Sequence, residues 1–300
     1  MRTPLRHSPW LSERAGGDVF LKLETLQPTF SYKLRGATNA VLKLAAASGG
    51  RRTTIVTASA GNHGRAMAHA ASAAGLPLTV YVPEGAPKTK VDAIRALGAE
   101  LRPCRDYDEA EHRAKEQGAR GIGVYISPYA HPDVIAGAGT VALEILEDLP
   151  DTATIVAAIG GGGLISGISI AVGSRAEAAG VEVEASTPFT TSLAAGKITQ
   201  IEVRDSLADG LTGNLDPDSP TFEIVRDGVR RIAVVSEEEL RAAVRGVADH
   251  ERLIVEGAAA AAVAAVATGK LDVRGRKAVV VLSGANIDLE TWAAACGVRA

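Results

Sequence analysis

Residues 154–172 read TIVAAIGGGGLISGISIAV, and this stretch decides the fold. An apolar, β-branched run typical of a buried strand leads into four consecutive glycines at 160–163 and then into a helical pattern. Glycines at such a junction let backbone N–H groups and the helix dipole close around a phosphate. The stretch therefore predicts a strand–turn–helix unit that binds a phosphorylated cofactor.

Similar units recur on both sides of this stretch. β-branched runs alternate with alanine-rich helical patterns, which is typical of a mostly parallel sheet covered by helices on both faces. The expected strands are residues 53–57, 78–83, 99–104, 154–160, 181–186, 231–236 and 277–284, and the expected helices are residues 64–74, 88–97, 107–117, 237–249 and 257–268. The predicted fold class is α/β with two lobes, each a mostly parallel sheet flanked by helices.

The two lobes divide the chain into a larger and a smaller domain. We expect residues 1–44 and 133–300 to form the larger domain, which carries the glycine run, and residues 45–132 to form the smaller one. No low-complexity linker and no repeat of 20 to 50 residues separates them. A cleft between these domains would receive residues from both ends of the sequence.

Composition limits the kinds of partner. The 300 residues are 46% hydrophobic and 22% charged, enough apolar material for a sizeable core. With 32 basic and 35 acidic residues the net charge is -3, which offers no basic face for nucleic acid and no polybasic membrane anchor. Cys104 and Cys296 lie far apart without a metal-type spacing and are expected to be inert thiols. A small-molecule partner is favoured.

Neither the N-terminal segment nor the most apolar stretch of the sequence predicts a membrane segment. The first ten residues, MRTPLRHSPW, lack the apolar core of a secretory signal, so a cytoplasmic protein is expected. Residues 257–268 are nearly all alanine and lie between Glu256 and Lys270. This stretch is too short and too weakly apolar to span a bilayer, and a buried helix is predicted there.

Lys33 stands in the segment FSYKLRGA, after the turn-like residues QPTFS and before a helix expected to begin near Arg35. A lysine forms an imine only as the neutral amine, so its site must disfavour the ammonium by desolvation or by nearby positive charge. Arg35 and Lys22 are candidates for that charge. By itself, Lys33 is more typical of a solvated lysine at the start of a helix, so other segments must decide.

The segment TASAGNHG places a second glycine-rich turn after a predicted strand. Gly61 and Gly64 permit a tight turn whose N–H groups face an anion, and Ser59, Asn62 and His63 add neutral donors. This turn suits a carboxylate, and Asn62 could also reach a phenolic oxygen. An ordinary turn capped by Ser and Asn has the same pattern.

The last segment with polar residues in a strand-end position is VVVLSGANID. Ligands of open α/β sheets lie at the carboxyl ends of the strands, so Ser283 is expected to meet whatever binds there. A Ser-Gly pair after a strand is also a common turn.

A dinucleotide site is the main alternative from another class. The run at 160–163 is no P-loop, and it fits GxGxxG poorly because Ser166 takes the third glycine position. However, Glu184 follows about twenty residues later, where a ribose-binding acid is expected. An NAD-linked oxidoreductase therefore stays open at this point.

Seven segments in this order, namely SYKLRGA, SAGNHG, HPDVIAGAGTVALEI, GGGGLISG, LADGL, EGAAAA and LSGANID, resemble the tryptophan-synthase-like group of pyridoxal-phosphate enzymes of fold type II. The resemblance is strongest to serine/threonine dehydratases and serine racemases. It implies that Lys33 carries pyridoxal 5'-phosphate as a Schiff base, that Asn62 bonds the ring hydroxyl and that Ser283 bonds the pyridine nitrogen. It also implies that the phosphate is held by Gly160, Gly161, Gly162, Gly163 and Leu164. The substrate carboxylate is then held by Ser59, Ala60, Gly61, Asn62 and His63.

The resemblance also implies an activity. It points to β-elimination of water from a small L-hydroxy-amino acid such as L-threonine or L-serine, which gives a 2-oxo acid and ammonia, with Lys33 as the base. A serine at the pyridine nitrogen does not enforce ring protonation, which favours elimination over transamination. The family usually forms homodimers, so a homodimer is expected.

Two positions discriminate within the family. Racemases carry a second serine after the first loop serine, where this chain has Ala60, so two-base racemisation is disfavoured and a serine racemase is the alternative. Cysteine synthases carry threonine where this chain has His63. A non-catalytic amino-acid binder is a third hypothesis, and the joint presence of Lys33, Asn62 and Ser283 argues against it.

Other departures concern metal binding, the pocket and regulation. Relatives bind a divalent cation through a glutamate, matched by Glu184, and an acid whose place Thr190 takes, so no metal site is predicted. Tyr32 replaces the phenylalanine of SFK and Ala138 replaces a glutamine, which leaves bulkier β-hydroxy amino acids open as substrates. The chain ends soon after Ser283, so no appended regulatory domain is expected.

Overall fold

A computed structural model describes residues 1–49 and 52–298 of the chain. By their internal contacts the residues form two compact units. Unit 1 comprises Met1–Tyr32 and the chain from Gly139 onward, and unit 2 is Lys33–Ala138. Each unit is built on its own sheet, and the two are described in turn.

Unit 1 contains a six-stranded sheet in the order β1-β2-β10-β7-β8-β9. The edge strand β1 is antiparallel to β2, and all other neighbours are parallel. The strands are β1 (Leu5–His7), β2 (Asp18–Leu23), β7 (Thr154–Ala158), β8 (Glu177–Val183), β9 (Val229–Val235) and β10 (Lys277–Leu282). Because β10 lies between β2 and β7, segments from the start, middle and end of the chain leave one edge of the sheet side by side.

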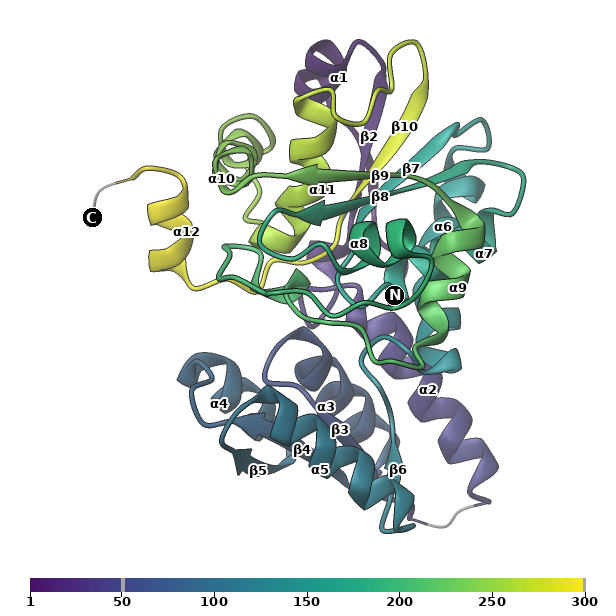
Figure 1. Cartoon of the computed structure of the whole chain (residues 1–300), viewed down its shortest axis with the longest axis vertical. Coiled ribbons are helices and arrows are strands. Elements are labelled where there is room, and N and C mark those ends of the chain that lie inside the picture. The colour runs from purple at the N-terminus through teal and green to yellow at the C-terminus, as the bar shows by residue number, and fades with distance from the viewer. Residues whose placement is uncertain (50–51, 299–300) are drawn as a thin grey trace. The chain divides into compact units, whose positions relative to one another are not determined.

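Helices cover both sides of this sheet. They are α1 (Pro9–Ala15), α7 (Gly163–Val172), α8 (Pro188–Ala195), α9 (Pro220–Gly228), α10 (Glu237–Gly246), α11 (Gly257–Ala267) and α12 (Leu289–Ala295). Figure 1 shows α10 and α11 to the left of strands β2, β10 and β7, and α7 and α9 to their right. A further helix, α6 (Pro132–Asp148), begins in unit 2 and continues into unit 1.

Helix α11 is the buried alanine-rich helix that the sequence predicts. All its residues except the last are buried, and it contacts β7, β8, β9 and β10. Alanine side chains allow a helix backbone to approach a sheet closely, which suits this central position. No helix in the described part of the chain combines the length and the hydropathy needed to span a bilayer.

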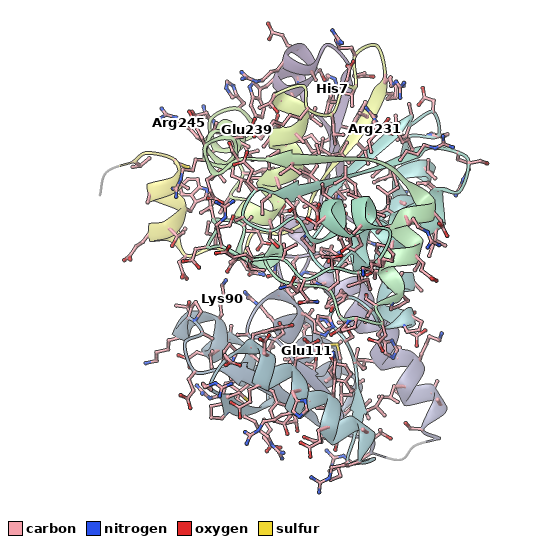
Figure 2. The ribbon with its side chains drawn as sticks, in the orientation of Figure 1. His7, Lys90, Glu111, Arg231, Glu239 and Arg245 are labelled. Carbon is pink, nitrogen blue, oxygen red and sulfur yellow. The ribbon has the colours of Figure 1, made fainter. Side chains whose placement is uncertain are left out.

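The start of α10 illustrates how the helices are terminated. The Ser236 hydroxyl accepts from the Glu239 N–H, and the Glu239 carboxylate accepts from the Ser236 N–H at 2.7 Å, which makes a capping box. Glu239, labelled in Figure 2, also pairs with Lys270 Nζ at 2.7 Å. These bonds fix the point at which the chain turns from β9 into α10.

Unit 2 contains a four-stranded, fully parallel sheet in the order β5-β4-β3-β6. Its strands are β3 (Ile55–Ala58), β4 (Leu78–Pro83), β5 (Glu100–Cys104) and β6 (Val124–Tyr125), and its helices are α2 (Lys33–Ala47), α3 (Asn62–Ala74), α4 (Lys88–Ala96) and α5 (Tyr107–Ala119). Ile55, Met67, Val80 and Ile94 are fully buried and make up much of its core. The predicted α/β fold class is thus confirmed for both units.

Some element boundaries differ from the prediction. Strand β8 begins at Glu177, four residues earlier than expected, because Gly180 makes room for Ile159, whose Cδ1 lies only 2.1 Å from where a Cβ would stand. Helix α2 begins at Lys33 rather than near Arg35, and α3 begins two residues before residue 64. The first turn of each helix was not predicted, because polar residues and glycines there interrupt the apolar helical pattern.

The compact units also differ in their bounds from the predicted domains. Residues 33–44 and 133–138 group with unit 2, whereas the sequence assigned them to the larger domain. Helix α2 packs along α3, and glycines bring the start of α6 onto α2. A Cβ on Gly137 would stand 2.5 Å from the Arg35 carbonyl oxygen. The functional division into domains stays a prediction.

We expect Gly137→Ala to lower the free energy of unfolding by about 1–3 kcal/mol, because the added methyl overlaps the Arg35 carbonyl. Gly85→Ala in the same unit is the matched control, because a Cβ there meets nothing within 4 Å and should change stability by less than about 0.5 kcal/mol. Urea unfolding followed by far-ultraviolet circular dichroism measures both. Equal stabilities of the two variants would contradict the close packing.

Candidate active site

The glycine loop between β7 and α7 leaves no room for side chains at two of its positions. Gly162 caps α7 with φ of 85°, and a Cβ there would stand 2.6 Å from Cζ of Phe189. A Cβ on Gly160 would stand 3.0 Å from the Gly210 carbonyl oxygen, so this loop also packs on the LADGL segment. The first-turn N–H groups of a helix lack intrahelical acceptors, and a phosphate suits them. The loop therefore fits the phosphate of the predicted cofactor.

Ser283 follows β10, the neighbour of β7, at the same edge of the sheet. Its carbonyl oxygen accepts from the Tyr32 N–H at 2.9 Å, and Gly284 forms an isolated bridge with Ser31. Lys33 is the next residue of the chain after Tyr32. The structure therefore attaches the segment that leads into Lys33 to the strand end that carries Ser283.

Glu256 joins the same cluster, and the sequence reading had given it no role. A Cβ on Gly284 would stand 2.6 Å from its Oε1, and its Oε2 accepts from the Asn286 N–H at 3.0 Å. The Asn286 side chain in turn donates to the Thr29 carbonyl at 2.9 Å. The motifs TFSY, EGAAAA and LSGANID are thus hydrogen-bonded into one structure within unit 1.

Lys33 is the first residue of α2 and is half-buried. Its Nζ donates to the Pro128 carbonyl oxygen at 2.7 Å. A carbonyl oxygen holds the amine in place without carrying a full negative charge. Leu164, which the sequence adds to the phosphate loop, is buried in the first turn of α7.

Lys22 corrects a sequence expectation. Its side chain is fully buried in β2, and its Nζ lies 2.7 Å from Glu144 Oε2 and 2.8 Å from the Thr3 carbonyl oxygen. The positive charge is therefore balanced by a carboxylate. Lys22 is a structural ion pair and not the source of unbalanced positive charge that was expected.

The second glycine-rich turn joins β3 to α3 within unit 2. Ser59 Oγ accepts from the Gly61 N–H at 3.2 Å, and α3 begins at Asn62, so Asn62 and His63 are first-turn residues. A Cβ on Gly64 would stand 2.3 Å from the Ser59 carbonyl oxygen, which explains the glycine. Ala60 is half-buried beside the apolar core of this unit. The turn presents helix N–H groups as a carboxylate requires.

The His63 side chain is buried and does not add the donor that the sequence predicted. Its Nε2 lies 3.1 Å from Thr57 Oγ1, whose own proton goes to the Ile126 carbonyl at 2.8 Å. Thr57 must therefore accept, so Nε2 carries the hydrogen and Nδ1 carries a lone pair. Burial, and then the positive charge of Lys33, hold the pKa of His63 well below 6.5. The ring is neutral.

This lowered pKa predicts how stability depends on pH. Unfolded His63 binds a proton below about pH 6.5 while the folded side chain does not, so the free energy of unfolding falls as pH falls below that value. His63→Gln, whose amide keeps a donor for Thr57 but does not titrate, should remove this part of the slope. Urea unfolding between pH 5 and pH 8 measures it. A slope that is unchanged in the variant would show that other groups cause it.

Glu184 and Thr190 are the two positions that the resemblance links to a metal site. Glu184 is exposed beyond the end of β8, and the Thr190 hydroxyl donates to the Glu182 carboxylate at 2.5 Å. No group of three or more His, Cys, Asp or Glu side chains with metal-binding geometry occurs among residues 1–49 and 52–298. Cys104 and Cys296 are buried free thiols. Ala138, at the position expected to be a glutamine, is buried.

Parallel sheets, a phosphate-type glycine loop and a half-buried lysine together define an α/β enzyme that works through a phosphorylated carbonyl cofactor. Comparison with known proteins agrees. Residues 1–284 match the model of the family described as pyridoxal-phosphate dependent enzyme. The chain belongs to this family, so the dinucleotide interpretation is replaced and the predicted cofactor is confirmed.

Several relatives match over nearly the whole chain. An L-threonine ammonia-lyase of Thermotoga maritima is 41% identical over 292 residues, which cover 96% of this chain and 72% of that protein. A serine racemase of Homo sapiens is 35% identical, with 97% and 88% covered. Among solved structures, the processed form of threonine deaminase isoform 2 from Solanum lycopersicum has a TM-score of 0.90 at 31% identity, with 100% and 88% covered. The expected resemblance to dehydratases and racemases is confirmed.

Proposed function

We propose that this protein is an ammonia-lyase that removes water from L-threonine or L-serine and releases a 2-oxo acid and ammonia. The observation that carries this function is Lys33, whose half-buried amine directly follows a segment hydrogen-bonded to the end of β10. The 41% identity to an L-threonine ammonia-lyase over 96% of the chain supports the same reaction. The substrate is a small amino acid.

Each predicted residue has a binding role in this proposal. The N–H groups of residues 160–164 hold the phosphate, and the Ser283 hydroxyl bonds the pyridine nitrogen. Asn62 bonds the ring hydroxyl, and the N–H groups of residues 59–63 hold the substrate carboxylate. The cramped glycines at 160 and 162 support the first assignment, because side chains there would occupy space beside the loop.

Lys33 performs the proton transfer. Pyridoxal phosphate, when bound, supplies the electron sink that makes the Cα–H bond of the substrate acidic. The Lys33 amine would take the Cα proton and give a proton to the β-hydroxyl, which leaves as water, while the carboxylate turn at residues 59–63 would hold the Cα–H bond in one orientation. A second water would then release ammonia and leave the 2-oxo acid. The His63 ring near Lys33 is neutral, because burial and then the charge of Lys33 lower its pKa.

Ala60 separates elimination from racemisation in this proposal. Racemisation needs a proton donor on the face of the substrate opposite the lysine, and an alanine methyl cannot supply one. Elimination needs only the lysine. A serine racemase is the second candidate, supported by the 35% identity to the human enzyme.

The remaining proposals concern assembly and location. We expect a homodimer in the cytoplasm that binds neither nucleic acid nor membranes. The balanced charge of -3 supports the absence of a nucleic-acid partner.

The reaction is tested by incubating purified protein with L-threonine or L-serine and measuring ammonia and the 2-oxo acid. We expect a yellow protein whose cofactor is fixed to Lys33 by borohydride, as peptide mass spectrometry would show. Lys33→Ala should lower kcat by roughly 10²–10⁴-fold or more. Lys43→Ala, which removes an exposed lysine from the same helix, should leave kcat unchanged. Protein that stays colourless with added pyridoxal phosphate, or a label on another lysine, would contradict the proposal.

Ala60→Ser tests the division between the two reactions. The added hydroxyl gives the substrate a second proton donor, so conversion of L-serine to D-serine should rise by about tenfold or more while elimination continues. Chiral chromatography of the remaining serine, with Cα hydrogen exchange in deuterated water, measures both. Wild-type protein that racemises serine as fast as it eliminates water would favour the serine racemase.

A further inference from the structure

Glu182 is a fully buried carboxylate in the middle of unit 1 that belongs to none of the motifs above. It lies in β8, among apolar residues of a central strand. A buried carboxylate is costly unless it is hydrogen-bonded. Its Oε1 accepts from the Phe189 N–H at 2.7 Å, and its Oε2 accepts from the N–H and the hydroxyl of Thr190 at 2.8 Å and 2.5 Å.

The donors to Glu182 form the first turn of α8. Thr187, which precedes this helix, makes no capping bond with its side chain. N–H groups in the first turn have no acceptor within a helix, so an outside acceptor must satisfy them. Glu182 is that acceptor, and a negative charge at this end also stabilises the helix dipole. The pKa of Glu182 is raised, because the effect of burial exceeds the opposite effect of the bonds from Thr190 and Phe189.

Helix α8 carries the contact from Glu182 to the glycine loop. The Phe189 ring is fully buried, and its Cζ stands 2.6 Å from where a Cβ on Gly162 would be. Thr221 lies against the same loop, because its Oγ1 donates to the Gly161 carbonyl oxygen at 2.9 Å and its Cβ stands 3.0 Å from where a Cβ on Gly162 would be. The loop is therefore confined by an aromatic ring and by a hydroxyl, and the ring's backbone N–H is held by Glu182.

We propose that Glu182 is a positioning residue for cofactor binding: by holding the first turn of α8 it presses Phe189 against Gly162 and keeps the glycine loop in the conformation that binds phosphate. This inference rests on the proposed assignment of residues 160–164 to the phosphate. Glu182 itself touches neither cofactor nor substrate.

Pyridoxal phosphate and pyridoxal, which lacks the phosphate, separate a phosphate effect from a general loss of structure. Protein stripped of cofactor is titrated with each compound, and the ratio of the two dissociation constants is the readout. In Glu182→Gln an amide NH2 faces N–H donors, so we expect the preference for pyridoxal phosphate to fall by about tenfold, with pyridoxal binding unchanged. Glu202→Gln, an equal change of charge at an exposed position, should retain the wild-type ratio.

Two substitutions at Thr190 disturb the same hydrogen bonds less than Glu182→Gln does. Thr190→Val removes one of the three bonds to Glu182 and should lower the preference by about threefold. Thr190→Ser keeps the hydroxyl and should therefore retain the wild-type preference for pyridoxal phosphate. This pair decides the question if Glu182→Gln does not fold. Thr191→Val, one residue further along α8, is the matched control.

The outcomes separate this inference from the assignment of the loop. Gly162→Ala should remove most of the preference, because its methyl overlaps Phe189. If Gly162→Ala loses the preference while Glu182→Gln and Thr190→Val keep it, the role of Glu182 is overturned and the loop assignment stands. If the Glu182 and Thr190 variants both weaken the binding of pyridoxal phosphate and of pyridoxal by the same factor, Glu182 has only a structural role. If Gly162→Ala keeps the preference, the phosphate lies elsewhere and both ideas fail.

Discussion

Close approach of backbone segments at the carboxyl edge of the six-stranded sheet is the constraint on which unit 1 depends. A Cβ on Gly257 would stand 2.3 Å from the Leu207 carbonyl oxygen, one on Gly284 2.6 Å from Glu256, and one on Gly160 3.0 Å from the Gly210 carbonyl oxygen. Each contact joins two different motifs of the sequence. The glycines therefore do more than make the loops flexible. Because they lack a side chain, they let four segments that are distant in the sequence meet where β7 and β10 end.

This constraint explains which parts of the protein could be predicted from the sequence. Alternating apolar runs and alanine-rich helices are local patterns, so β4, α4 and the buried helix α11 lie where they were expected. The glycine-rich turns were also predicted, because glycines directly after a strand permit a tight turn at the start of a helix. Strand β8 was the exception. Its first half, EAAG, has the composition of a helix, but it is a strand because it pairs with β7 and β9, and Gly180 leaves space for Ile159.

Side-chain partners could not be predicted in the same way, because they come from remote parts of the chain. Lys22 pairs with Glu144, 122 residues away, and nothing near Lys22 indicates that partner. The tautomer of His63 follows from a proton that Thr57 gives to Ile126. Glu182 was read as part of an ordinary strand, since its role depends on where α8 begins. In each case the sequence supplies the residue and the fold supplies its chemistry.

The hydrogen-bond partner of Lys33 bears on the proposed role of this lysine as the base. The Pro128 carbonyl oxygen accepts a hydrogen bond from an ammonium or from a neutral amine, whereas a carboxylate would strongly favour the ammonium. A base that takes and returns a proton needs both states to be populated. The nearby His63 ring is neutral as well, because burial and then the charge of Lys33 lower its pKa. Within unit 2, a neutral dipole, the Pro128 carbonyl, thus holds the amine in place in either protonation state.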